Sequence, residues 1–126
     1  MKQKSHKRSE NVEFHDIGLW ATNKDAFDPR QDVYVHDDQT WKVRTLTSIK
    51  RMLGHQGRVI AVLKLDIEGY EWDIVDNLIE TGMFKFIRQF ILEWHIFKDL
   101  PTKAEYVRIY KVSWKTCQKQ NINIKC

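Results

Sequence analysis

The sequence predicts an α/β fold built on a parallel sheet. Residues 59–65 are a short apolar run rich in β-branched side chains, which is typical of a strand buried on both faces of a parallel sheet. Strand and helix patterns alternate around this run, and that order implies parallel pairing through crossover connections. Acidic side chains follow directly at Asp66, Glu68 and Glu71. In open α/β sheets the ligand crevice lies at the carboxyl ends of the strands, so these acids mark the expected site.

Length and composition limit the classes of protein to consider. A chain of 126 residues is one domain at most, and 42% hydrophobic and 12% aromatic residues favour a packed interior over disorder. No apolar run is long enough to cross a bilayer, and residues 1–8 lack the apolar segment of a signal peptide. Two cysteines, Cys117 and Cys126, indicate neither a disulfide framework nor a zinc site.

The amino-terminal part shows weak patterns. Residues 1–10 are polar and basic and are expected to be disordered, which leaves residues 11–126 as the domain. Alternation from Val12, followed by the apolar residues 17–20, predicts a strand that ends in a tight turn. Residues 21–39 contain many turn-forming Asp residues around one short strand candidate at 33–35. We therefore expect a loop or hairpin there.

Helix patterns follow on both sides of the central strand. An apolar repeat over 46–53 lies between Thr45, an N-cap residue, and Gly54, where a left-handed C-cap would fall. A second apolar stripe over 72–79 ends at Gly82. Each pattern predicts one helix.

The last third of the chain repeats the strand-helix order. Residues 86–95 predict a second strand, and the capping box at 102–105 predicts the start of a long final helix. Residues 121–124 alternate like the beginning of a further strand.

Four polar groups follow the two best strands and form the candidate site. Asp66 and Glu68 follow the first strand, and Glu93 and His95 end the second. Parallel neighbours would bring them together, where they could act as a general base, hold a substrate cation or bind a divalent ion. The alternative is that Asp66 and Glu68 only cap the next helix, and Glu71 is better explained by the helix dipole or a salt bridge. The other histidines have no metal-ligand spacing, and no metal is assigned.

A family resemblance lies in the same residues. Residues 63–72, LKLDIEGYEW, resemble the Lys-x-Asp-x-Glu-Gly-x-Glu signature of FkbM-type methyltransferases, and more closely relatives of methyltransferase-like protein 24. Residues 41–49 look like the lead-in helix of that family, residues 89–95 like its next strand, and residues 17–20 like the strand end beside the adenine. The resemblance extends over about residues 12–98.

This resemblance implies a Rossmann-like class I fold that binds S-adenosylmethionine and moves its methyl group to an oxygen or nitrogen. It implies that Asp66 lies nearest the reacting groups and contacts the cofactor, with Glu68, Glu93 and His95 as base or orienting residues. Gly18 and Leu19 would flank the cofactor's base. The acceptor would be an unidentified small or glycan-like molecule.

The chain departs from the family pattern in one respect. No Gly-x-Gly occurs in it, so the glycine-rich turn and the amino-terminal cofactor-binding strands are expected to be missing, as in a carboxyl-terminal fragment. We then expect weak or no cofactor binding and an unpaired strand edge at 59–65, open to self-association or a protein partner. The alternative functions are a non-catalytic interaction module on a degenerate methyltransferase scaffold and, less favoured, nucleic-acid binding through the basic ends.

Overall fold

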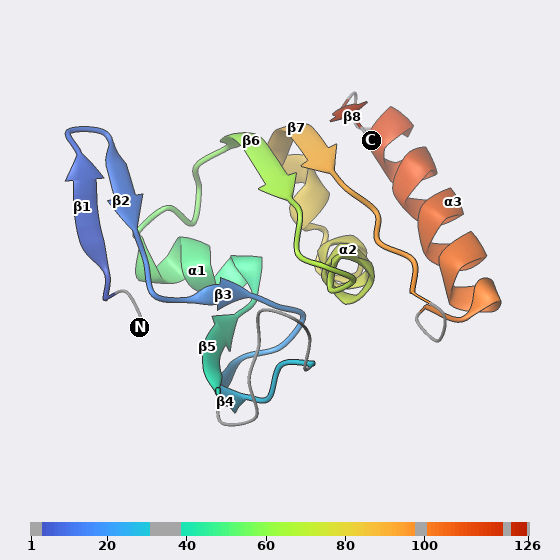
Figure 1. The fold of residues 1–126 in the computed structure, drawn as a ribbon. Helices are drawn as coiled ribbons and strands as arrows, with labels where there is room; N and C mark the ends of the chain where they lie inside the picture. Colours follow the sequence, from blue (N-terminus) through green and yellow to red (C-terminus); the bar gives the residue numbers. More distant parts are fainter. Residues whose placement is uncertain (1–3, 31–38, 98–100, 120–121, 126) are drawn as a thin grey trace.

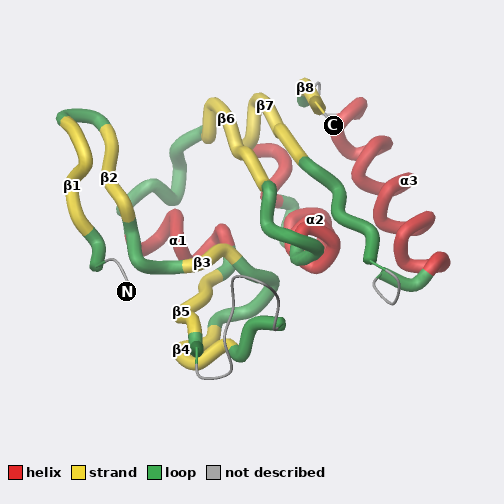
Figure 2. The backbone as a smooth tube through the Cα atoms, viewed as in Figure 1, coloured by secondary structure: helices red, strands yellow, loops and turns green. Residues whose placement is uncertain are grey.

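The structure, a computed structural model, describes residues 4–30, 39–97, 101–119 and 122–125. Its strands form three small sheets, accompanied by three α-helices and a 3₁₀ helix (Figures 1 and 2). The elements in chain order are β1 (His6–Ser9), β2 (Val12–Phe14), β3 (Gly18–Leu19), β4 (Lys24–Phe27), β5 (Trp41–Arg44), α1 (Leu46–Met52), β6 (Ile60–Leu65), α2 (Glu71–Glu80), η1 (Met83–Phe86), β7 (Ile87–Leu92), α3 (Lys103–Lys119) and β8 (Asn123–Lys125).

The parallel sheet predicted from the sequence is present as β6–β7–β8. Both strand pairs are parallel, and Leu65 lies opposite Leu92, so β6 and β7 end at the same rim. Helices α2 and α3 lie beside this sheet (Figure 1). Side chains of the sheet and helices form the core, because the apolar stripe of α2 and the inward face of β7 are buried together. The most buried core side chains are Ile74, Val75, Leu78, Phe84, Phe90 and Cys117.

The expectation that the central strand is buried on both faces is wrong. The side chain of Val62 on β6 is 50% exposed, and that of Val59 just before it is 49% exposed. Within the described residues β6 pairs with β7 alone, so its other edge is unpaired. An unpaired edge at residues 59–65 is also what we expected from the sequence.

The start of the chain also differs from the expectation of disorder over residues 1–10. Residues His6–Ser9 form β1, which pairs antiparallel with β2, and the ring of His6 lies 5.3 Å from that of Phe14. This hairpin projects away from the β6–β7–β8 sheet (Figure 1). The third sheet has the order β3–β5–β4, and the strand candidate at 33–35 lies outside the described residues.

The capping residues in the sequence predicted the ends of the first two helices correctly. Thr45 Oγ1 accepts from the backbone N of Ser48 at 3.2 Å, and Gly54 and Gly82 both adopt the left-handed conformation. Strand β7 ends at Leu92, three residues earlier than expected, and the 3₁₀ helix η1 was not anticipated. The described helices include none with the length and apolar character that a bilayer crossing requires.

Candidate functional site

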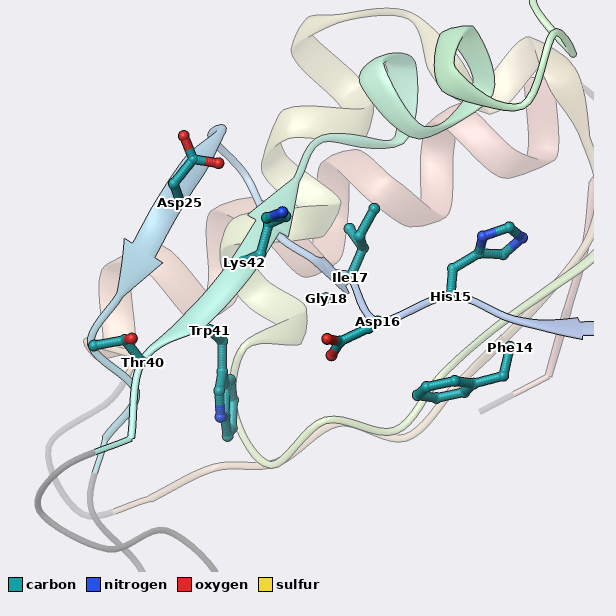
Figure 3. A pocket seen from close by; sticks show the side chains of 9 residues that line it. All are labelled: Phe14, His15, Asp16, Ile17, Gly18, Asp25, Thr40, Trp41 and Lys42. Atoms are coloured by element: carbon teal, nitrogen blue, oxygen red, sulfur yellow. The ribbon is translucent and has the colours of Figure 1, made fainter. Parts of the chain in front are cut away.

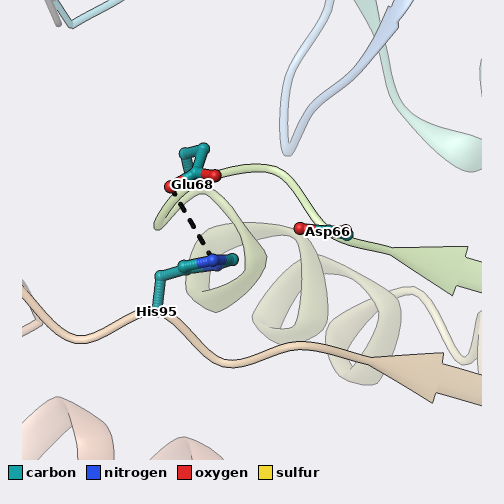
Figure 4. Close-up of side chains that lie close together, drawn as sticks. All are labelled: Asp66, Glu68 and His95. Carbon is teal, nitrogen blue, oxygen red and sulfur yellow. Dashed lines mark ion pairs between the residues drawn. The ribbon is translucent and has the colours of Figure 1, made fainter. Parts of the chain in front are cut away.

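Four polar residues gather at the rim where β6 and β7 end, and we call them the rim cluster: Asp66, Glu68, Glu93 and His95. One ligand atom each from Asp66, Glu68 and His95 lies within 4.8 Å of the other two (Figure 4). His95 Nε2 is 3.7 Å from a Glu68 carboxylate oxygen and 3.9 Å from one of Glu93. The predicted convergence of the two strand ends therefore occurs.

A fourth acid, Glu71, lies behind His95 and holds this cluster in place. Its side chain is completely buried and accepts from the backbone N of Ile67 at 2.7 Å and of Gly69 at 2.8 Å. It also accepts from His95 Nδ1 at 2.8 Å. A carboxylate only accepts, so Nδ1 carries the proton and Nε2 faces Glu68 and Glu93. The sequence suggested a salt bridge for Glu71, but its hold on the loop was missed; its place as the last acid of the motif was the available signal.

The loop between β6 and α2 has an unusual backbone. Glu68 has φ 54°, and Gly69 has φ 95°, a conformation that L side chains rarely adopt. A Cβ atom on Gly69 would lie 2.8 Å from the ring of Phe97. Arg30 Nη2 donates to the Glu68 carbonyl at 2.7 Å, and its guanidinium lies 4.1 Å from the Phe97 ring centre. Arg30 therefore fixes the loop that presents Glu68.

The position of His95 is fixed by aromatic neighbours as well as by Glu71. Trp72 Nε1 donates to the His95 carbonyl at 2.7 Å, and the Trp72 ring lies 3.9 Å from that of Trp94. Burial of the imidazole lowers its pKa, but the hydrogen bond to Glu71 and the charges of Glu71, Glu68 and Glu93 outweigh it. The pKa of His95 is therefore raised above its ordinary value.

An aromatic cavity of about 280 Å³ adjoins the rim cluster. Gly18 and Leu19, the residues expected beside the cofactor's base, line this cavity, whereas Asp66 does not. Glu68 belongs to both the cavity and the cluster. The Trp20 and Tyr70 rings meet edge to face at 5.0 Å. The remaining lining residues, which the sequence did not single out, are Phe27, Arg30, Trp41, Val43 and Ile67.

Comparison with known families adds the decisive observation. A family model described as a methyltransferase domain matches residues 2–122. The chain belongs to this methyltransferase domain family. No curated protein and no solved structure matches it. The matched residues of the methyltransferase domain include the rim cluster, the aromatic cavity and the amino-terminal hairpin, whose first strand was expected to be disordered.

The methyltransferase domain has a second, more polar cavity of about 420 Å³ (Figure 3). Gly18 and Trp41 line both cavities, so the two cavities adjoin at the β3–β5 strand pair. Its other lining residues are Phe14, His15, Asp16, Ile17, Asp25, Thr40 and Lys42.

Methyltransferase domains generally use S-adenosylmethionine, and the aromatic cavity fits part of that molecule. Its rings offer stacking surfaces for a planar base. Its volume is just below the roughly 300–1,000 Å³ of pockets that enclose a drug-sized ligand. The glycine-rich turn that would wrap the methionine part does not occur in the sequence. The residues present therefore fit the base and leave the other end of the cofactor without its usual support.

Proposed function

We propose that the chain forms the acceptor side of an S-adenosylmethionine-dependent methyltransferase of the FkbM type, related to methyltransferase-like protein 24. The observation that supports this most is the shared position of Glu68, which joins the rim cluster to the aromatic cavity. A cavity suited to a nucleoside base beside a group of proton acceptors is the arrangement that methyl transfer to oxygen or nitrogen needs.

The bound cofactor would supply a methyl group on a sulfonium, which an oxygen or nitrogen nucleophile attacks in line. The chain's own residues then have to align that nucleophile and remove its proton. We assign the alignment to Asp66 and Glu68, with Asp66 nearest the reacting groups, and proton uptake to Glu93 and His95. Gly18 and Leu19 flank the base in the cavity.

Activity requires more than the residues of this sequence. The missing glycine-rich turn would belong to a segment that pairs with the open edge of β6, where the described residues provide no neighbouring strand. We propose that such a segment, in the same polypeptide or in a partner, completes the enzyme, and that this chain alone is inactive or nearly so.

Substitution of Asp66 tests the proposed function. The completed enzyme is incubated with methyl-labelled S-adenosylmethionine and fractionated small hydroxyl and amine compounds, including glycans. Asp66→Asn should lower methyl transfer at least about 100-fold, the size expected for a positioned catalytic group. Glu80→Gln, at the far end of α2, is the matched control and should transfer normally. Equal transfer by wild type and Asp66→Asn would contradict the proposal.

The open edge of β6 supports a second candidate, a non-catalytic interaction module. Val62 on β6 and Val59 just before it are exposed, and the outer edge of β6 is unpaired among the described residues. Such an edge is a typical template for strand addition by another protein. Val62→Lys should disrupt partner binding under this hypothesis, whereas Asp66→Asn should leave it nearly intact. Partner capture that responds to Val62→Lys, without methyl transfer by any completed form, would favour the interaction module.

A further inference from the structure

We propose that the rim cluster binds one divalent cation of the Mn²⁺ type through carboxylate oxygens of Asp66 and Glu68 and through Nε2 of His95. The sequence assigned no metal, and the inference comes from how the loops place these three side chains (Figure 4). Binding itself is independent of the proposed function; only the role given to the cation rests on it.

The spacing of the three donor atoms suits a common ion. They lie within 4.8 Å of one another, and His95 Nε2 is 3.7 Å from Glu68. Ligands about 2.0–2.2 Å from one ion are at most about 4.4 Å apart, so only a small closure is needed. The Asp66 side chain is 39% exposed and that of Glu68 is 56% exposed, so both have room to rotate.

The histidine is held in the orientation that metal-binding histidines adopt. Its Nδ1 donates to the buried carboxylate of Glu71, which leaves Nε2 as the nitrogen aimed at the cluster. A carboxylate behind the imidazole fixes its tautomer and raises its basicity, and it is the usual outer partner of a histidine ligand. Glu71 is itself fixed by two backbone donors, so the ring has little freedom to turn away.

Local charge also favours a cation. Four carboxylates, those of Asp66, Glu68, Glu71 and Glu93, surround His95 and its neighbours. Among the ion pairs of the described residues, one lysine pairs with these carboxylates: the Lys64 ammonium lies 3.4 Å from Asp66. Carboxylate oxygens suit Mg²⁺ and Mn²⁺, and an imidazole nitrogen shifts the preference toward the transition metal.

A cation here would have an open side toward solvent and the aromatic cavity. There it could hold the hydroxyl of an acceptor and lower its pKa, as divalent ions do for bound water. With Nε2 of His95 on the cation, proton uptake falls to Glu93 alone. Glu93 lies outside the donor set, 65% exposed and 3.9 Å from His95, and is placed to receive the hydroxyl proton.

The test is a Mn²⁺ titration of the full chain, followed by the loss of the electron paramagnetic resonance signal of free Mn²⁺. The expected result is one saturable site, with affinity at least tenfold weaker in both Glu68→Gln and Asp66→Asn. His95→Gln should have the same effect, and tryptophan fluorescence of the Trp72–Trp94 pair checks that each variant is folded.

Asp76→Asn is the matched control. Asp76 lines another acidic pocket together with Asp73 and Glu105, and no histidine lines that pocket. Arg108 pairs with Asp76 there at 2.8 Å. This variant should bind Mn²⁺ like wild type. Unsaturable binding, or equal weakening by Asp76→Asn and Glu68→Gln, would overturn the proposal. Saturable Mn²⁺ binding without methyl transfer would reject the proposed function and leave the cation site standing. Methyl transfer that does not depend on the metal would reject only the role given to the cation in that reaction.

Discussion

The two halves of the chain contribute different things to the molecule. All fully buried members of the main core cluster lie between Leu46 and Ile122, whereas the strands before residue 45 are short and mostly exposed. The carboxyl-terminal half also carries the rim cluster, and the amino-terminal half supplies most of the aromatic cavity wall. Stability is therefore concentrated in one half, while the proposed cofactor site depends on contacts between the two, chiefly at Tyr70 and Arg30.

The largest effect should come from the core of the carboxyl-terminal half. Leu78 is completely buried on α2, so Leu78→Ala should lower the free energy of unfolding by about 2–5 kcal/mol. Val12 in the amino-terminal hairpin is 52% exposed, and Val12→Ala should change it by about 0.5 kcal/mol or less. Urea unfolding followed by circular dichroism measures both, and similar losses would show that stability is shared evenly.

Within the rim, the buried acid should matter more for stability than the exposed one. Glu71→Gln places an amide NH₂ against one of the donors that Glu71 now accepts from, the backbone N of Ile67 or His95 Nδ1. The free energy of unfolding should fall by about 1.5–3 kcal/mol. Glu93 is 65% exposed, so Glu93→Gln should cost about 0.5 kcal/mol or less. Equal costs in urea unfolding would mean that Glu71 does not hold the loop.

Loss of the hydrogen bond that joins the two halves should lower stability less than loss of Glu71. Tyr70 Oη accepts from the backbone N of Arg30 at 2.5 Å, so Tyr70→Phe should cost about 0.5–1.5 kcal/mol and speed amide exchange at Arg30. Tyr110→Phe, on the exposed face of α3, is the control and should change neither quantity. Unaltered exchange at Arg30 in Tyr70→Phe would show that this hydrogen bond does not join the halves.

The smallest effect should be a pH-dependent one at Asp73. Its pKa is raised above the ordinary 3.8, first by burial and then by the charges of Glu105 and Asp76. The folded state then binds more protons than the unfolded state, so this contribution to stability is present below the unfolded pKa and is lost as pH rises through the folded one. Asp73→Asn should therefore raise the melting temperature slightly at pH 7 but not at pH 3. An equal shift at both pH values would contradict this assignment.

The carboxyl-terminal half could be predicted because periodicity, caps and burial agree there. The parallel pairing, the caps at Thr45 and Gly54 and the meeting of Asp66 with His95 all follow from local patterns. The amino-terminal half lacks such patterns, so β1 was expected to be disordered. The contacts that were missed join residues far apart in the sequence, which local patterns do not reveal. Glu71 bonds to His95, 24 positions away, and Arg30 bonds to Glu68, 38 positions away.

The most direct test of the account is whether the aromatic cavity receives the cofactor's base. Saturation-transfer NMR with S-adenosylhomocysteine reports which ligand protons touch the protein. If the cavity holds the base, the adenine protons show the strongest saturation and the homocysteine part shows weak saturation. Both are lost in Trp41→Ala, which removes a cavity wall. Absence of adenine saturation, or saturation that Trp41→Ala leaves unchanged, would contradict it.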